Sequence, residues 1–530
     1  MSYNKEKLDE EQVEFTDTPE RRMSVAEEVT ELSGIEATAT SKAAWLISLT
    51  ISICGLLFGY DTGYISSVLV TLGRALGHEL SHSEEELVTS LTSGGALVGA
   101  VYAGLSADKW GRKMPIWVAC ALFLIGTILQ TAAFSVPQFA VGRFIVGLGV
   151  GSASMIAPMF IGEIAPARYR GRMIAFNNLS VTFGQFVASA LGAGFQHVGP
   201  NGWRATVGIG AIPAIVLAGL LVMVPESPRQ LVAHNQVERA DAALQKIYTA
   251  STREQRDAKI KSIQMSLAET HTIMAETSLW QSFSSIFTTP ATGRAVLTAC
   301  LVMATSQLGG FNTLMYYAAT LFALVGFSNA TAVAMTVSGT NFVFSFLNLV
   351  LVDRFGRRII LCITILGMSI CMAIAAISFH WIPIDKTLSL VGEPPSWAPA
   401  IVLVSIICYV GFFSSGVATI AWIGTELIPL EVRAVGTMTN TVTCWSTNII
   451  IASTFLSIMK GATPSGAFGL YSGICFLGWL FVIFFYPEVK GMPLESIREV
   501  FATGFGVKYS KQWQRENKHV PKVKTEVFTH

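Results

Sequence analysis

The chain has 530 residues, of which 52% are hydrophobic and 13% are charged, and its formal net charge is +1. Soluble globular proteins carry roughly 25% charged residues, so this composition excludes a large soluble enzyme, and the balanced charge argues against a nucleic-acid partner. Of the 71 charged residues, 43 lie within residues 1–42, 225–290 and 487–530. The rest of the chain therefore has the composition of a membrane protein.

Apolar stretches long enough to cross a bilayer follow one another along the chain. A membrane helix needs about 20 mostly apolar residues to span a hydrocarbon core of roughly 30 Å. Twelve stretches qualify: 44–69, 88–107, 115–134, 138–161, 173–194, 204–224, 294–322, 330–352, 359–379, 399–424, 434–458 and 466–486. We predict an all-α membrane protein with twelve transmembrane helices, and their even number puts both termini on one side.

Basic residues in the short loops predict which side that is. The loops after the second, fourth, eighth and tenth stretches hold ten Lys and Arg residues, whereas the opposite loops hold Arg74, Arg204, Lys386 and Lys460. Positive loops remain in the cytoplasm, so we expect a multi-pass protein of the cell membrane with both termini and the central linker inside. Within the linker, residues 237–248 have the periodicity of a surface helix.

Three motifs of the first half return in the second half. DKWGRK (108–113) recurs as DRFGRR (353–358), EIAPARYRGR (163–172) as ELIPLEVRAV (426–435), and PESPR (225–229) as PEVKG (487–491). Two parallel six-helix repeats are the plan of transporters whose substrate site lies between the halves at the midplane. The predicted units are an N-terminal tail (1–42), a first half (43–224), a linker (225–292), a second half (293–486) and a C-terminal tail (487–530).

The repeated motifs place acidic residues beside arginines at the inner ends of the helices. We expect these charges to form a cytoplasmic ion-pair latch that holds the halves together when the cavity faces outward. Simple positive-inside anchors are the alternative, but orientation does not require the acidic partners. The latch residues are Asp108, Arg112, Glu163, Arg170, Asp353, Arg357, Glu426 and Arg433.

With these motifs in hand, residues 43–500 resemble the sugar porter family of the major facilitator superfamily. The resemblance rests on FGYDTG (58–63), the two D-x-x-G-R-[KR] loops, GRFIVGLGVG (142–151), PMFIGEIAPARYRG (158–171), PESPR, GFNTLMYY (310–317) and PEVKGMPLE (487–495). Within that family the chain is most similar to fungal myo-inositol/proton symporters, through DTGYISSVL (61–69), NTLMYY and the spacing of Trp422 and Glu426. The resemblance implies the major facilitator fold and transport of a small sugar or polyol.

Asp61 and Arg143 are the charged residues that lie deep within the predicted spans. An ionisable residue in lipid is costly and marks a functional site by default. Burial raises the pKa of a carboxyl group and a nearby arginine lowers it, so a conformational change can switch proton affinity. We therefore expect this pair to couple a proton to transport, and the resemblance implies the same for Asp61; a static ion pair is the alternative.

Amide side chains and tryptophans in the spans are candidates for binding a polyol. Each hydroxyl of a polyol is both donor and acceptor, which amides complement, although amides also join membrane helices to one another. The candidates, which match the family's sugar ligands, are Gln185, Gln307, Asn312, Asn341, Trp422 and Trp445.

Three positions depart from the family pattern. Ser306 stands where a first glutamine is usual, Cys444 replaces an amide before Trp445, and Ala421 replaces a proline before Trp422. Compared with the usual pattern, this chain thus lacks two amide ligands and one helix bend. Because a site built to bond a given hydroxyl discriminates strongly, these departures weaken the identification of the substrate.

The expected function is import of a polyol or monosaccharide, first myo-inositol, together with a proton. A hexose or pentose transporter or facilitator and a non-transporting nutrient receptor are the alternatives; Asp61 and the short tail after residue 486 argue against the facilitator and the receptor. The eight cysteines lack the spacing of disulfides or of a metal site. The sequence indicates neither catalysis nor a cofactor, and its partners are the substrate, a proton and the lipid bilayer.

Overall fold

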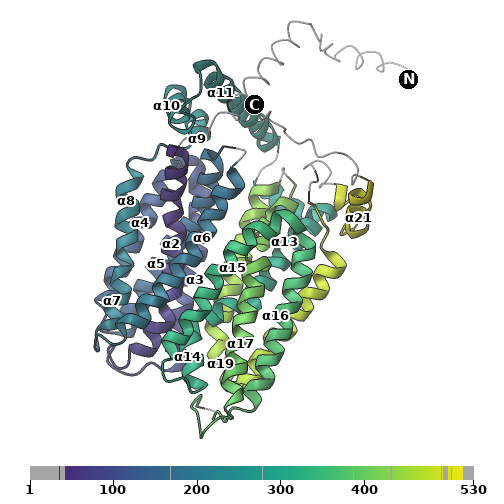
Figure 1. The fold of residues 1–530 in the computed structure, drawn as a ribbon. Coiled ribbons are helices and arrows are strands. Elements are labelled where there is room, and N and C mark those ends of the chain that lie inside the picture. The colour runs from purple at the N-terminus through teal and green to yellow at the C-terminus, as the bar shows by residue number, and fades with distance from the viewer. Residues whose placement is uncertain are drawn as a thin grey trace, which may run out of the picture.

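The computed structural model describes residue 35 and residues 42–166, 169–276, 279–385, 387–429, 432–490, 492, 499–502 and 504–516. The predicted N-terminal tail thus lies largely outside the described residues, whereas about half of the predicted C-terminal tail is described. The described elements are helical, and they form two bundles that stand side by side, one from each half of the chain (Figure 1).

The first bundle contains six crossings. The chain enters through a long helix, and its last crossing is divided into two helices at Gly210. The elements are α2 (Lys42–Thr71), α3 (His82–Trp110), α4 (Lys113–Thr131), α5 (Val136–Ile164), α6 (Arg170–Phe195), α7 (Gly202–Ile209) and α8 (Ala211–Leu221). Ser81 and Glu84 form a capping box at the start of α3, which satisfies its first backbone donors.

The second bundle repeats this plan with more interruptions. Gly310, with a φ of 94°, separates the two helices of the seventh crossing, and Thr463, with a φ of 64°, separates the last two crossings. The elements are α13 (Pro290–Leu308), α14 (Phe311–Leu324), α15 (Ala330–Phe355), α16 (Arg357–His380), α17 (Trp397–Phe412), the π-helix η1 (Phe413–Val417), α18 (Ala418–Ile423), the 3₁₀ helix η2 (Gly424–Leu427) and α19 (Arg433–Phe485).

The helices account for twelve crossings. Among the described residues, ten helical stretches are long and apolar enough to span a membrane, and one of them, Val435–Phe485, holds two crossings. The twelfth is α6, whose 26 residues have the required length. The predicted class, an all-α protein with twelve transmembrane helices in two halves, is confirmed.

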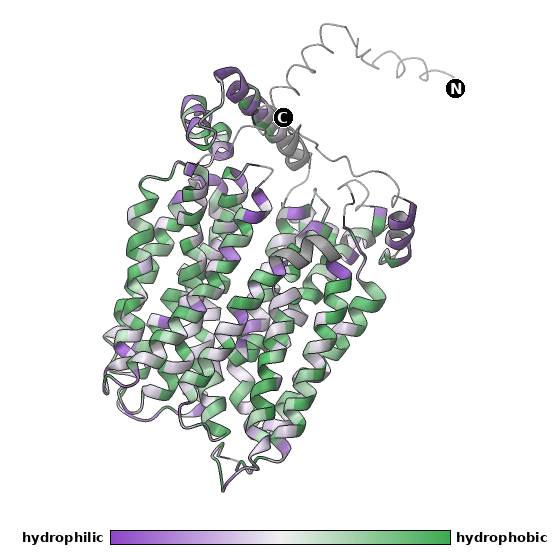
Figure 2. Ribbon diagram, in the orientation of Figure 1, coloured by the Kyte–Doolittle hydropathy of each residue, from purple (hydrophilic) through white to green (hydrophobic). Residues whose placement is uncertain are grey.

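The helices outside the twelve crossings, most of them polar, lie at one end of the bundles, which we name the linker end. They are α9 (Pro228–Ala233), α10 (Val237–Ile247), α11 (Arg253–Glu276), α12 (Leu279–Thr288) and α21 (Val507–Glu516). Figure 2 shows hydrophilic residues on α9 to α11 and on α21, whereas the bundles are mostly hydrophobic. The helix predicted at residues 237–248 is confirmed as α10.

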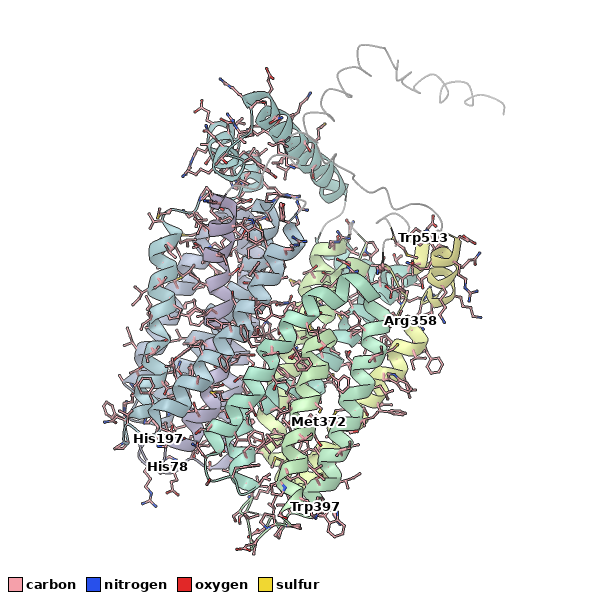
Figure 3. All side chains as sticks on the ribbon, in the orientation of Figure 1. His78, His197, Arg358, Met372, Trp397 and Trp513 are labelled. Atoms are coloured by element: carbon pink, nitrogen blue, oxygen red, sulfur yellow. The ribbon has the colours of Figure 1, made fainter. Side chains whose placement is uncertain are left out.

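The opposite end of the bundles is named the far end. Figure 3 shows Arg358 and Trp513 at the linker end, and His78, His197 and Trp397 at the far end. The crossings alternate in direction between these ends, so residues near the middle of each helix meet at the midplane.

Candidate functional site

Asp61 of α2 and Arg143 of α5 form an ion pair inside the first bundle. Nη1 of Arg143 lies 2.7 Å from Oδ1 of Asp61, and the two side chains are 1% and 3% exposed. Arg143 also donates from Nε to the carbonyl oxygen of Val88 at 3.0 Å. The two charged residues that the sequence places deep in the predicted spans are therefore bonded to each other in the structure.

Tyr64 and Gln130 complete the surroundings of this pair. The Tyr64 hydroxyl lies 2.8 Å from Oδ1 of Asp61 and 2.8 Å from the Gln130 amide, and Arg143 donates to it at 3.0 Å. Oδ1 thus has two donors, whereas Oδ2 of Asp61 is buried without a hydrogen-bond partner among the described residues. One carboxylate oxygen is therefore available to hold a proton.

A row of polar side chains runs from one bundle to the other near the midplane. Nδ2 of Asn341 on α15 donates to Oε1 of Gln185 on α6 at 2.6 Å. Gln185 continues to Thr62 of α2 at 3.2 Å, beside Asp61 in the sequence, and Ser414 of η1 donates to Asn341 at 2.6 Å. This row links the region of Asp61 in the first half to the tenth crossing of the chain, which consists of α17, η1, α18 and η2 in the second half.

Gln307 and Asn312 belong to a second polar cluster. Asn312 donates to Oε1 of Gln307 at 2.6 Å, and Asn448 of α19 approaches the same oxygen at 3.4 Å. Oδ1 of Asn448 accepts from Ser93 of α3 at 3.1 Å and from Tyr316 of α14 at 3.3 Å. Because Ser93 lies in the first half, this cluster also joins the two bundles.

The two tryptophans occupy different surroundings. Trp445 of α19 is 2% exposed and packs against Phe58 of α2 in the other bundle, with ring centroids 5.7 Å apart. Its indole nitrogen has no hydrogen-bond partner among the described residues. Trp422 of α18 is partly buried and packs against the core of the second bundle.

Sequence reasoning missed Asn448, Ser414 and Thr62, although each contributes a polar atom to these clusters. The signal for Asn448 was present, because it lies one helical turn after Cys444 and hence on the same face of the helix. It supplies an amide near Cys444, the position where this chain lacks the amide of the family pattern. Ser414 gave no such signal, since its place depends on the π-helix.

The repeated motifs at the linker end share a backbone clamp. The Glu226 carboxylate accepts the amide hydrogens of Arg112 at 3.0 Å and of Lys113 at 3.2 Å. The Glu488 carboxylate accepts those of Arg357 at 3.3 Å and of Arg358 at 3.0 Å. Each carboxylate thus holds the start of one helix, α4 or α16, to the chain that follows its bundle.

The side chains of the latch residues form ion pairs with partners in their own half. Arg112 donates to Glu163 at 2.9 Å and to Asp108 at 2.9 Å. Burial alone would lower the pKa of Arg112, but the hydrogen bonds and charges of Glu163 and Asp108 raise it above its ordinary value. The guanidinium therefore remains charged.

The second half has a looser version of this arrangement. Nη2 of Arg357 lies 3.7 Å from Oε2 of Glu426, and Arg433 donates to the carbonyl oxygen of Ile428 at 3.2 Å. The side chain of Asp353 lies outside the described residues. Arg170 takes no part in these contacts among the described residues. The latch remains a prediction, because the described pairs each join residues of one half.

Hydrogen bonds also join the two halves toward the far end. Glu86 of α3, 5% exposed, accepts from the amide and the hydroxyl of Ser457, each at 2.7 Å. Gln196 donates to Asn329 at 2.9 Å, and the hydroxyl of Ser66 accepts the amide hydrogen of Ala319 at 2.8 Å. These contacts hold the two halves together in this part of the molecule.

The absence of proline at position 421 does not leave the tenth crossing regular. α18 is helical across Ala421, but η1 precedes it and η2 follows it. Asn348 of α15 donates to the carbonyl oxygen of Ser414 at 2.9 Å, in the segment where the π-helix interrupts the α-helical hydrogen-bond ladder. The helix is regular at Ala421 itself, as the missing proline predicts, and the irregular segments lie before and after it.

Comparisons with known proteins agree with this architecture. Residues 47–501 match the sequence model of the family described as "Sugar (and other) transporter". Myo-inositol transporter 1 of Cryptococcus neoformans is 42% identical over 478 residues, covering 90% of this chain and 84% of that protein. Myo-inositol transporter 1 of Saccharomyces cerevisiae is 39% identical over 485 residues, covering 90% and 83%.

Solved structures with the same fold include the xylose transporter XylE from E. coli. In its partially occluded inward open conformation it has a TM-score of 0.70 and 26% identity, covering 86% of this chain and 100% of that one. The proton:xylose symporter XylE bound to 6-bromo-6-deoxy-D-glucose has a TM-score of 0.71 and 26% identity, covering 87% and 100%.

Proposed function

The chain belongs to the sugar transporter family, and from this premise we propose that it imports a polyol or monosaccharide, first myo-inositol, together with a proton by alternating access. Its activity is transport rather than catalysis, as in the relatives of its family. The observation that carries the coupling is Asp61, whose Oδ1 is bonded to Arg143 and Tyr64 while its buried Oδ2 has no partner among the described residues.

Protonation of Asp61 is the coupling step. Neutralising the carboxylate weakens its ion pair with Arg143, and the freed guanidinium changes the packing between α2 and α5. Loss of the proton restores the pair. A proton that falls through 100 mV supplies about 2.3 kcal/mol, enough for roughly fifty-fold accumulation of the substrate.

The polyol takes the place of the hydrogen bonds that now join the amides to one another. In the present arrangement Gln185 bonds Asn341 and Gln307 bonds Asn312. A bound polyol exchanges these bonds for bonds to its hydroxyls, with Trp422 and Trp445 as aromatic walls. The first choice of myo-inositol is supported by the names of the relatives. Asn448 supplies an amide near Cys444, where this chain lacks the amide of the family pattern.

The linker end faces the cytoplasm and the protein resides in the cell membrane, as the loop charges suggest. With the far end held by Glu86 and Ser457, the described state is then closed to the outside. The latch charges form their bonds between halves in the opposite state: Arg112 and Arg357 exchange partners as the linker ends approach.

Uptake of labelled inositol, xylose, glucose and fructose by a transport-deficient cell tests the proposal at several external pH values. We expect inositol uptake to be saturable, stimulated by acid and abolished by a protonophore. Asp61→Asn removes accumulation, roughly fifty-fold at 100 mV, but retains exchange of labelled for unlabelled substrate. Asp385→Asn, an exposed carboxylate at the far end, is the matched control and leaves both activities intact.

Other outcomes separate the alternatives. Uptake that changes neither with pH, nor with a protonophore, nor in the Asp61→Asn variant would contradict proton coupling and identify a facilitator. Hexose uptake that excess inositol does not inhibit contradicts the choice of substrate. A lack of transport of all four compounds, with growth signalling retained, would identify a receptor.

A further inference from the structure

A cavity of about 560 Å³ opens at the linker end of the first bundle, away from the polar clusters between the halves. The turn between α3 and α4, the end of α8 and the short helices α9 and α10 form its walls. It therefore lies where membrane-spanning helices meet the polar helices, at the level of hydrophilic α10 in Figure 2.

Basic side chains converge on this cavity from three separate elements. Lys109 ends α3, Lys113 begins α4, and Arg239 and Lys246 extend from α10, two turns apart. Burial lowers the pKa of Lys113 and the Glu226 carboxylate raises it, while the like charges of Lys246 and Arg239 also lower it. The four basic side chains give the cavity an excess of positive charge, which favours an anionic occupant.

The protein's own carboxylate at the cavity already has other partners. Glu226 is the one acidic residue among the described residues that line it. Its oxygens accept the amide hydrogens of Arg112, Lys113 and Ser227 at 3.0, 3.2 and 2.9 Å. Glu226 belongs to the backbone clamp, and its single negative charge does not balance the four basic residues that line the cavity.

Apolar side chains mark the side of the cavity that faces lipid. Val222 and Met223 line it at the end of α8 and are 68% and 77% exposed. Such exposure of apolar residues at the end of a transmembrane helix fits contact with acyl chains. An occupant with an anionic head and an apolar tail matches both walls, whereas a soluble anion matches the basic wall alone.

We propose that this cavity binds the phosphate headgroup of an anionic phospholipid from the cytoplasmic leaflet. Lysine and arginine are the residues that bind phosphate, and basic residues beside a membrane attract anionic lipid. The bound headgroup joins α10 to the turn between α3 and α4, and hence to the Glu226 clamp. The proposal rests on the proposed orientation and not on the identity of the substrate.

The test uses the full chain in discs of phosphatidylcholine, with phosphatidic acid as the probe and native mass spectrometry to count bound lipid. The double substitution Arg239→Gln/Lys246→Gln removes two charges from the cavity. Lys508→Gln/Lys511→Gln removes two exposed charges from α21, outside the cavity. We expect the first pair to weaken phosphatidic acid binding by about tenfold or more, and the control pair to leave it within about twofold.

A soluble competitor separates lipid from free phosphate. Glycerol phosphate carries the same phosphate without the acyl chains, and we expect it to displace phosphatidic acid poorly. Equal loss of binding in both double variants would overturn the proposal in favour of general surface attraction, and effective displacement by glycerol phosphate would overturn the lipid as occupant. If the α10 variant melts at a lower temperature, Lys109→Gln provides the same comparison. Because binding is measured without transport, failure here is distinct from failure of the proposed symport.

Discussion

The two halves of the molecule carry the same linker-end motif but bond it differently. In the first half the side chains of Arg112 and Glu163 are 6% and 11% exposed and lie 2.9 Å apart. In the second half those of Arg357 and Glu426 are 19% and 51% exposed and lie 3.7 Å apart. Both halves keep the carboxylate clamp, through Glu226 and Glu488. The duplicated motif therefore preserves the backbone contact more closely than the ion pair.

The helices behind these motifs differ in the same direction. α5, which carries Glu163, is one continuous helix, whereas the crossing that carries Glu426 is broken by a π-helix and a 3₁₀ helix. Such irregular segments occur at functional hinges. We infer that the tenth crossing is where the second half can change shape, whereas its counterpart in the first half, α5, has no such break.

We expect the largest difference between the halves when the arginine of each ion pair is substituted in turn. Arg112→Gln leaves Glu163 buried without its cation, and breaking a buried pair costs about 3–5 kcal/mol. Arg357→Gln breaks a partly exposed pair, which is worth about 0–1 kcal/mol. Thermal unfolding of the purified variants should therefore show a large loss of stability for Arg112→Gln alone. Equal losses would show that the two ion pairs are energetically alike despite their geometry.

The second test asks whether the backbone clamps are equivalent. Gly111 has φ and ψ of 84° and −175°, and Gly356 has 88° and 159°. This region is essentially restricted to glycine, with a strain of about 1–3 kcal/mol for other residues. A Cβ atom would also lie 2.6 Å from Glu226 Oε2 or 2.7 Å from Glu488 Oε2.

We expect Gly111→Ala and Gly356→Ala each to destabilise the protein by about 3 kcal/mol, the upper end of that range. The measurement is again thermal unfolding, and Gly171→Ala, where a Cβ atom meets nothing within 4 Å, is the control. A large difference between the two clamp variants would contradict the equivalence of the halves at the backbone.

A smaller effect follows from substituting the clamp carboxylates themselves. Glu226→Gln and Glu488→Gln keep one accepting oxygen but place an amide group against a backbone donor. Hydrogen bonds to charged groups contribute about 1.5–3 kcal/mol, so we expect a loss of about 2 kcal/mol in each variant. Glu238→Gln, an exposed acid on α10, should leave unfolding unchanged. A clamp variant that is as stable as this control would show that the charge is not needed.

Sequence reasoning could predict the crossings because lipid demands long apolar helices. It could also select Asp61 and Arg143, because a charge inside an apolar stretch is costly in lipid and marks a functional position. The repeats identified the clamp segments, but the role of Glu226 and Glu488 was not predicted, since a backbone contact between distant segments leaves no periodic signal.

The remaining differences arise where tertiary contacts override local pattern. Ala421 predicted that one bend is missing before Trp422, and the helix is regular there. The π-helix lies earlier, at Phe413–Val417, where Asn348 from another helix bonds the carbonyl group of Ser414. Ser414 reaches the polar row only because of that irregular turn. Partners of this kind depend on packing between helices and cannot be read from one segment alone.

The smallest expected effect concerns this turn of the second half. Asn348 donates from one nitrogen to the carbonyl oxygen of Ser414 at 2.9 Å and to the hydroxyl of Thr419 at 2.6 Å. Asn348→Ala removes both bonds, whereas Thr419→Val removes only the second bond. A typical hydrogen bond contributes about 1 kcal/mol, so Asn348→Ala should lower the free energy of unfolding by about 1 kcal/mol more than Thr419→Val does. If the tenth crossing acts as a hinge, Asn348→Ala should also slow inositol uptake more than Thr419→Val does. Equal uptake in both variants would show that the π-helix is a fixed feature of the fold and not the place where the second half changes shape.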